Sequence, residues 1–182
     1  ENIKRRGIIA IKLDAGDELV WSNLTTGSDD VFIVTKEGKV IRFAEKSVRP
    51  MGRATTGVRG IKLIGDDQVI GMDVIAKGDK PDFLTIMDNG LGKKTNVDLF
   101  RGQSRAGQGI KVAKVTDKTG KVAFAQIVPA KCEEVIITSK KGQVVKLSIN
   151  DIPKLSRDTQ GVILMRYSDK ADKVASATCI LG

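Results

Sequence analysis

Basic side chains recur along this chain at a fixed spacing, and they are the residues with the clearest chemistry. Lys and Arg offer positive charge and N–H donors to phosphate oxygens, so a regular series of them predicts contact with a polyanion, most simply nucleic acid. Each position alone could equally be a solvated surface residue. Three series share a spacing of 52 residues: Arg42, Lys94 and Lys146; Arg53, Arg105 and Arg157; and Lys62, Lys114 and Arg166.

Several kinds of catalytic and metal chemistry lack the residues they need. The chain has no His and only two Cys, Cys132 and Cys179, so zinc sites and Ser-His-Asp or Cys-His catalysis are excluded. Tyr167 is the only Tyr, and no acids are arranged about it to hold a metal. We therefore predict no catalytic, cofactor-binding or metal-binding residue. Two cysteines are too few for a disulfide framework and fit a reducing compartment.

The positive charge is concentrated in one part of each repeat. The net charge is +9, yet residues 36–63, 88–115 and 140–167 carry +6, +4 and +4, so the rest of the chain carries −5. If the repeats surround an axis, this charge forms a curved belt that fits bent duplex DNA. An anionic membrane surface is the second partner that charge alone would allow, but no apolar run approaches the ~18–20 residues that span a bilayer.

The composition favours duplex DNA with little sequence preference. Aromatic residues make up 4% of the chain and fall in strand patterns, whereas single-strand binders stack bases on exposed aromatics. No recognition helix or zinc module is visible for base readout. The predicted DNA contacts are Lys39, Arg42, Arg49, Arg53, Arg59, Lys93, Lys94, Arg101, Arg105, Lys140, Lys141, Lys146, Lys154 and Arg157. The Arg42 series is expected at the surface, whereas the Arg53 series could equally donate to backbone carbonyls and hold a connection in shape.

Short strands must position these residues. Apolar runs flank turns at Gly38, Gly90 and Gly142, which predicts three hairpins over 31–43, 83–95 and 135–147. A strand opened by glycine follows each hairpin, at 57–63, 109–115 and 161–167, and further strands are expected at 19–25, 69–75, 122–128 and 174–180. Residues 97–100 and 149–155 could form helical turns. About four strands per repeat predict an all-β, propeller-like array of three full units and a partial one.

The array is expected to form one domain over residues 1–182. The partial unit is GIIAIKL at 7–13, which matches GVRGIKL at 57–63. The chain does not begin with Met and begins inside a repeat, which suggests a piece of a longer domain.

Four segments resemble the C-terminal domain of the DNA gyrase A protein: MGRATTGVRGIKL (51–63), AIKLDAGDELV (10–20), TKEGKVIRF (35–43) and DTQGVILMR (158–166). The resemblance implies a β-pinwheel of four-stranded blades that exchange strands. It implies a non-catalytic domain that wraps DNA, so that the whole ATP-dependent type II topoisomerase can introduce negative supercoils. The catalytic tyrosine, ATP and Mg would belong to other parts of that enzyme. The expected partners are duplex DNA, the rest of gyrase A and gyrase B, in the cytoplasm with the nucleoid.

One departure from the family leaves an alternative open. Gyrase A carries a basic box of the form QRRGGKG, whereas KRRG at 4–7 is only a partial look-alike that aligns with the strand-opening glycine. The C-terminal domain of the corresponding topoisomerase IV protein, in which such boxes are degenerate or absent, therefore remains an alternative. A propeller-like scaffold whose basic belt binds an acidic protein is a second alternative. An enzyme site at the propeller axis is a third, which no clustered side chains favour.

Overall fold

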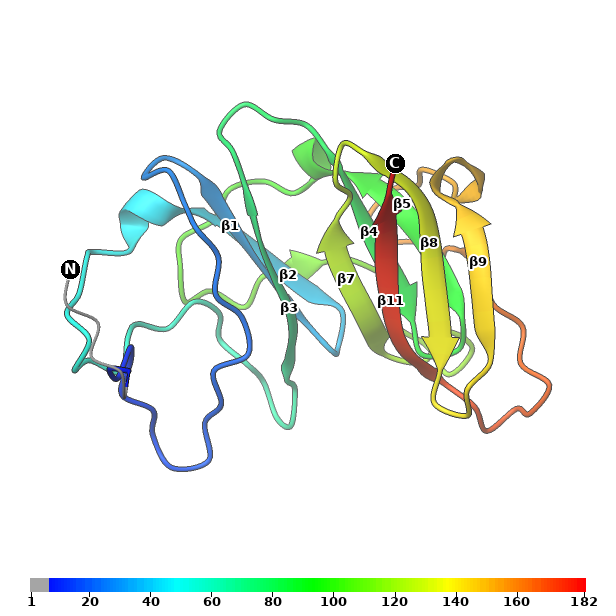
Figure 1. Ribbon diagram of the computed structural model, residues 1–182, viewed down its shortest axis with the longest axis horizontal. Coiled ribbons are helices and arrows are strands. Elements are labelled where there is room, and N and C mark those ends of the chain that lie inside the picture. Colours follow the sequence, from blue (N-terminus) through cyan, green and yellow to red (C-terminus); the bar gives the residue numbers. More distant parts are fainter. Residues whose placement is uncertain (1–6) are drawn as a thin grey trace.

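The computed structural model describes residues 7–182, and every strand pairing between its strands is antiparallel (Figure 1). The strands are β1 (Asp30–Thr35), β2 (Lys39–Ala44), β3 (Val69–Ile75), β4 (Asp82–Met87), β5 (Leu91–Asn96), β6 (Ile110–Lys111), β7 (Val122–Ile127), β8 (Cys132–Ser139), β9 (Val144–Ser148), β10 (Val162–Ile163) and β11 (Val174–Leu181). Three 3-10 helices, η1 (Glu45–Ser47), η2 (Val97–Leu99) and η3 (Ile149–Asp151), each follow the second strand of a hairpin. The all-β prediction is confirmed.

The strands form three sheets that follow one another along the chain. Their strand orders are β3-β1-β2-β6 in the first sheet, β10-β5-β4-β7 in the second and β11-β8-β9 in the third. The predicted hairpins are β1–β2, β4–β5 and β8–β9. Their turn glycines Gly38, Gly90 and Gly142 have φ of 77°, 80° and 88°, a region that only glycine enters at little cost. The hairpin prediction is therefore confirmed at all three positions.

Neighbouring repeats exchange strands. β6 follows the β4–β5 hairpin in sequence, yet it pairs with β2 of the first sheet, with Lys39 opposite Lys111. β10 likewise pairs with β5 of the second sheet, with Gly92 opposite Val162. Each of these two sheets thus receives its last strand from the next repeat, as the resemblance to a pinwheel implies.

The prediction of strands at 19–25 and 57–63 is wrong, because neither segment is a strand. By their spacing, 57–63 corresponds to β6 and β10, and 19–25 corresponds to β3. The described residues place no hairpin beside either segment, so neither can form a ladder. Lys4, Arg5 and Arg6 of the KRRG look-alike lie outside the described residues.

The exchanged strands β6 and β10 are also shorter than predicted, with two residues each. After β6 the backbone hydrogen bonds go to residues outside the β2–β6 ladder. Val112 N donates to Gly38 O at 2.9 Å, and Lys114 N donates to Thr159 O at 3.1 Å. The chain therefore turns away from β2 towards the hairpin turn and the next repeat.

The core lies between the sheets. Phe32, Phe83 and Phe100 pack together between the first and second sheets, with ring centroids 5.7–6.0 Å apart. A second cluster, which includes Leu84 and Ile86, lies between the second and third sheets. β4 is therefore buried on both faces, because the second sheet is covered on either side.

Two of the 3-10 helices carry side-chain caps that fix their first turn. The Asn96 side chain accepts from Asp98 N, and the Ser148 hydroxyl accepts from Asn150 N. The helical turns expected within 97–100 and 149–155 are confirmed. The second turn, η3, covers only the first three residues of its expected range. The capped turns fix the carbonyls of Val97 and Ile149, which accept hydrogen bonds from side chains of the previous repeat.

Candidate nucleic-acid interface

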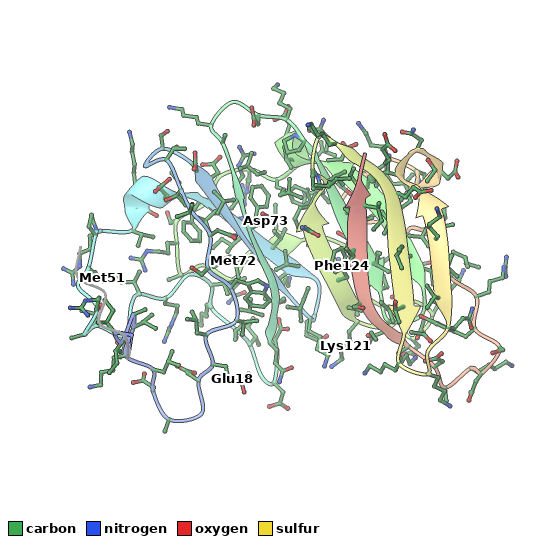
Figure 2. The ribbon with its side chains drawn as sticks, viewed as in Figure 1. Glu18, Met51, Met72, Asp73, Lys121 and Phe124 are labelled. Carbon is green, nitrogen blue, oxygen red and sulfur yellow. The ribbon has the colours of Figure 1, made fainter. Side chains whose placement is uncertain are left out.

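One edge of each sheet faces its neighbours. β3 contacts β7, and β7 contacts β11. The approach is close, because a Cβ on Gly71 would lie 2.8 Å from Ala125 O. Asp73 of β3 accepts a hydrogen bond from Ile127 N at 2.8 Å, and burial raises the pKa of this carboxyl (Figure 2). We call the opposite edge, formed by β6 and β10 with the connections that lead to them, the outer edge.

Contacts at the hairpin turns also join neighbouring sheets. Lys121, which precedes β7, pairs with Glu37 in the first hairpin turn at 2.5 Å, and this hydrogen bond raises the pKa of Lys121 (Figure 2). Tyr167 donates its hydroxyl to Asp88 O at 2.9 Å, and burial raises its pKa to about 12. The only tyrosine in the chain therefore has a structural contact across two repeats.

Arg42 is not a surface side chain, contrary to the prediction. It lies on β2 with 19% of its side chain exposed, pairs with Asp30 at 2.6 Å, and packs 5.5 Å from the Phe32 ring centre. Its guanidinium also donates to Val97 O and Phe100 O, each at 3.2 Å, in the η2 turn of the next repeat. Arg42 therefore ties the first sheet to the second repeat.

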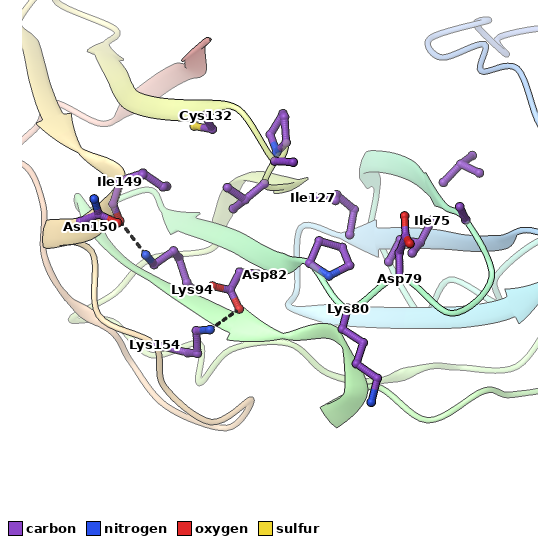
Figure 3. A pocket seen from close by; sticks show the side chains of 16 residues that line it. Ile75, Asp79, Lys80, Asp82, Lys94, Ile127, Cys132, Ile149, Asn150 and Lys154 are labelled. Carbon is purple, nitrogen blue, oxygen red and sulfur yellow. Dashed lines mark hydrogen bonds and ion pairs between the residues drawn. The ribbon is translucent and has the colours of Figure 1, made fainter. Parts of the chain in front are cut away.

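Lys94 repeats this contact one unit later. Its ammonium donates to Ile149 O at 2.6 Å, in the η3 turn of the third repeat, and both residues line a cavity of about 630 Å³ (Figure 3). Ile149 lies 52 residues after Val97, so the two contacts are equivalent. Lys146 is exposed and pairs only with Glu134 of its own hairpin among the described residues, at 2.8 Å. The expected surface location is confirmed for Lys146 and is wrong for Arg42 and Lys94.

Two members of the Arg53 series donate to backbone carbonyls and hold a connection in shape, which is one of the two roles predicted for the series. Arg105 donates to Arg59 O at 2.7 Å, and Arg157 donates to Lys111 O at 3.0 Å. Both acceptors lie 46 residues before the donor, so the contact follows the repeat. These half-buried guanidinium groups hold the connections at the outer edge in shape. Arg53 occupies the same position and is exposed.

Lys93 cannot contact DNA directly, contrary to the prediction. It is 1% exposed, and its ammonium donates to Ser156 O at 2.6 Å. Burial is the main cause that lowers its pKa to about 8. The charge at this position therefore belongs to the interior of the second repeat.

Some predicted contacts are exposed but already paired. Lys154 pairs with Asp82 at 2.9 Å, and both line the cavity in Figure 3. Lys141 pairs with Asp169. Exposed ion pairs are weak, so these lysines can still exchange partners. The remaining predicted residues make no ion pair with any described residue: Arg49, Arg59, Arg101 and Lys140, which are exposed, and Lys39, which is half-buried.

The predicted set of DNA contacts omitted the basic series whose three members are all exposed. Lys62, Lys114 and Arg166 are all exposed, and each follows the strand-opening glycine by five residues. Lys62 N donates to Gly107 O and Lys114 N to Thr159 O, so equivalent backbone contacts fix both positions. Lys62 also lines a small hollow beside Lys39. The 52-residue spacing was the signal that identified this series.

No helix in residues 7–182 is long and apolar enough to cross a membrane. The same range contains no group of three or more His, Cys, Asp or Glu side chains that could hold a metal ion.

Solved structures share this fold. The structure of the DNA gyrase A C-terminal domain matches with a TM-score of 0.83 and 24% identity, over 97% of this chain and 59% of that chain. The crystal structure of the C-terminal domain of DNA topoisomerase IV matches with a TM-score of 0.85 and 21% identity, over 94% of this chain and 53% of that chain. The likeness to both shows the fold.

The relatives in sequence are DNA gyrase A proteins. The DNA gyrase A protein of Salmonella typhimurium (strain LT2) is 44% identical over 168 residues, which is 92% of this chain and 19% of that protein. The DNA gyrase A protein of Aminobacterium colombiense is 39% identical over 180 residues, or 99% of this chain and 22% of that protein. The chain thus spans about a fifth of the length of these bacterial relatives.

The family described as DNA gyrase C-terminal domain, beta-propeller, matches this chain at residues 1–25, 29–76, 82–129 and 133–180. These four segments coincide with one partial and three full repeats. The matched segments include the exchanged strands β6 and β10, which form part of the outer edge. The chain therefore belongs to the family of DNA gyrase C-terminal domains.

Proposed function

We propose that this chain binds duplex DNA along its outer edge and bends it, as part of the gyrase A protein. The observation that carries the proposal is the exposed series Lys62, Lys114 and Arg166, which places a cation at the same point of three successive repeats. A partner that meets all three must present negative charge at regular intervals over a long distance. Duplex DNA does so, because it carries a phosphate charge about every 1.7 Å of its axis.

The proposed surface binds the DNA backbone rather than the base edges. No helix in residues 7–182 is longer than three residues, so this part of the chain cannot place a recognition helix in the major groove. Bending a site of 20–30 bp costs on the order of 1–6 kcal/mol, which several repeats must offset together. Firm contacts between sheets, such as those of Arg42 and Lys94, allow the repeats to act as one curved surface.

In the whole protein, the bent DNA would be presented to the cleavage core that other parts of gyrase A form. Gyrase B, ATP and Mg would then support negative supercoiling, and this chain would supply no catalytic group. The identity to gyrase A proteins supports this assignment over topoisomerase IV. We place the activity in the cytoplasm, with the nucleoid.

Binding to duplex DNA should be independent of sequence and steeply dependent on salt. Each neutralised phosphate contributes about −0.9 to the slope of log K against log salt concentration. Titrations with a duplex long enough for three repeats, and with one long enough for a single repeat, should give a steeper slope for the long duplex. A salt-independent affinity, or equal binding of an acidic polypeptide, would instead favour a protein-interaction scaffold.

Replacing Lys62, Lys114 and Arg166 together with Ala should weaken binding to long duplexes without affecting the fold. Three lost phosphate contacts should reduce the salt slope by about 2.7. The melting temperature should stay near that of the wild type, because exposed substitutions usually change stability by less than about 0.5 kcal/mol. Salt titrations and thermal melts measure the two effects.

A triple variant of Lys118, Lys131 and Lys170 is the matched control. These lysines are also exposed, and their removal costs the same charge, but they lie in the turns that precede β7, β8 and β11. If the control lowers affinity as much as the first triple variant, net charge and not the outer edge governs binding.

A further inference from the structure

Lys93 breaks the repeat at an interior position. The equivalent residues are Ile41 on β2, which is 0% exposed, and Val145 on β9, which packs against the second core cluster. Lys93 itself is 1% exposed. The second repeat therefore has an ammonium where the other two have a hydrocarbon side chain, and function or local structure must compensate for the cost of burying it.

All three donors of this ammonium are used within one short segment. Lys93 Nζ donates to Ser156 O at 2.6 Å, Arg157 O at 2.5 Å and Thr159 Oγ1 at 3.0 Å. A lysine ammonium has three N–H donors and no acceptor, so this site satisfies it completely without an ion pair. We call residues 154–159 the Lys93 corner.

The Lys93 corner belongs to the outer edge. Arg157 donates to Lys111 O of β6, and Asp158 pairs with the Lys111 ammonium at 3.3 Å. Thr159 O accepts from Lys114 N, which belongs to the exposed basic series. The corner thus lies where exposed cations of the second and third repeats come together.

The equivalent corner of the second repeat, residues 102–107, is held without a buried charge. Gln103 N donates to Arg42 O and Ala106 N donates to Gly60 O, both at 2.7 Å. Beneath it, Ile41 Cδ1 would lie 3.7 Å from a Cβ on Gly107, an ordinary packing distance. This corner is a natural internal control for the Lys93 corner.

We propose that Lys93 is a positioning residue for DNA binding, whose buried ammonium holds the Lys93 corner in the conformation that presents Lys154 and the neighbouring Lys114 to the duplex. This inference rests on the proposed function. Lys93 acts through the segment that it holds, because its own side chain is inaccessible to DNA.

The charge of Lys93 makes the corner sensitive to alkaline pH. The charged groups that face the ammonium are Asp158, which raises its pKa, and Arg157, which lowers it, while Thr85 lies opposite on β4 and Lys111 is paired with Asp158. Carboxylates and guanidinium groups keep their charge between about pH 7 and pH 9.5. Lys93, with its pKa lowered to about 8, is the group there that changes charge over this interval.

Loss of this proton should neither unfold the protein nor release the corner. The folded pKa is below the usual lysine value, so between about pH 8 and pH 10.5 the unfolded chain binds more protons than the folded one. The contribution of Lys93 to the free energy of unfolding therefore rises with pH in that interval. A local opening that exposes Lys93 to water also takes up a proton in this interval, so a rise in pH opposes that opening as well.

The test uses the full chain, the variant Lys93→Ile and the charge-matched surface control Lys118→Ala. Isoleucine restores the residue type of the first repeat. At about pH 7 and pH 9.5, amide hydrogen exchange of residues 154–159 is compared with that of residues 102–107 in the same sample, which cancels the intrinsic effect of pH. Affinity for a long duplex is measured at the same ionic strength.

In the wild type, protection of the Lys93 corner relative to residues 102–107 should rise about tenfold at the higher pH, and DNA affinity should not fall. At neutral pH, Lys93→Ile should lower the relative protection of the corner and reduce DNA affinity about five- to tenfold, as for the loss of one or two phosphate contacts, and neither quantity should change further when the pH is raised. Lys118→Ala should keep the wild-type pH profile.

An unchanged exchange ratio in the wild type, or a Lys93→Ile variant that binds DNA as the wild type does, would overturn the inference. If Lys93→Ile does not fold, the wild-type pH series alone decides. If the wild type does not bind duplex DNA at neutral pH, the proposed function fails, while the exchange ratio still reports whether Lys93 holds the corner.

Discussion

Replacing Gly161 with Ala should destabilise the fold by about 3 kcal/mol or more. Gly161 opens the exchanged strand β10 with φ of +80°, and a Cβ there would lie 2.5 Å from Gly92 O and 2.8 Å from Gly92 C. The clash is with backbone of β5, which cannot turn aside as a side chain could. Overpacking of about 1–3 kcal/mol adds to about 1–2 kcal/mol for a left-handed non-glycine residue.

Gly57 is the matched control, because it has the same place in the repeat and φ of +83°. Around it only Ile11 Cδ1 comes within range, at 4.0 Å from the built Cβ. Gly57→Ala should therefore destabilise the fold only by the cost of a left-handed non-glycine residue, about 1–2 kcal/mol. Gly109→Ala should resemble Gly161→Ala, since its Cβ would lie 2.6 Å from Val40 O.

Thermal melts followed by circular dichroism measure these differences. For a chain of this size, 1 kcal/mol corresponds to about 2–4 °C in melting temperature. Gly161→Ala and Gly109→Ala should melt well below Gly57→Ala. Equal shifts in all three variants would show that the glycines serve only local turn geometry and that the exchanged strands do not pack as described.

Replacing Arg42 with Ala should destabilise the fold by about 2–3 kcal/mol, because it removes charged hydrogen bonds and leaves Asp30 without its partner. The side chain is 19% exposed and makes contacts in two repeats. Lys94→Ala should cost less, about 1–2 kcal/mol, since one hydrogen bond to Ile149 O is lost. Lys146→Ala should change stability by less than about 0.5 kcal/mol, as an exposed residue does.

Thermal melts and duplex affinity are both needed to separate structure from binding. The three residues share one place in the repeat, so a direct role in DNA binding predicts three similar losses of affinity with normal melts. The structure instead predicts graded melts, and any loss of DNA affinity in Arg42→Ala should be accompanied by a lower melting temperature. A normal melt for Arg42→Ala together with weakened DNA binding would contradict the contacts to Val97 O and Phe100 O.

Local interactions explain why much of the fold could be predicted from the sequence. A hairpin depends on neighbouring residues, so the turn glycines and flanking apolar runs were enough to place β1–β2, β4–β5 and β8–β9. β3 over 69–75 was predicted with its bounds as observed. The 52-residue spacing likewise identified equivalent positions, including the exposed Lys62 series.

Equivalent positions nevertheless acquired different roles, which only the tertiary structure decided. Segment 57–63 has the pattern of β6 and β10 but forms no strand, because a strand needs a partner and the sequence pattern does not supply one. Arg42 and Lys146 share a spacing, yet Arg42 reaches a neighbouring 3-10 turn and Lys146 reaches only its own hairpin. Lys93 looked like a surface cation because nothing local shows that the next repeat covers it. Periodicity determined which residues are equivalent, whereas long-range packing between sheets determined which of them are exposed to a partner.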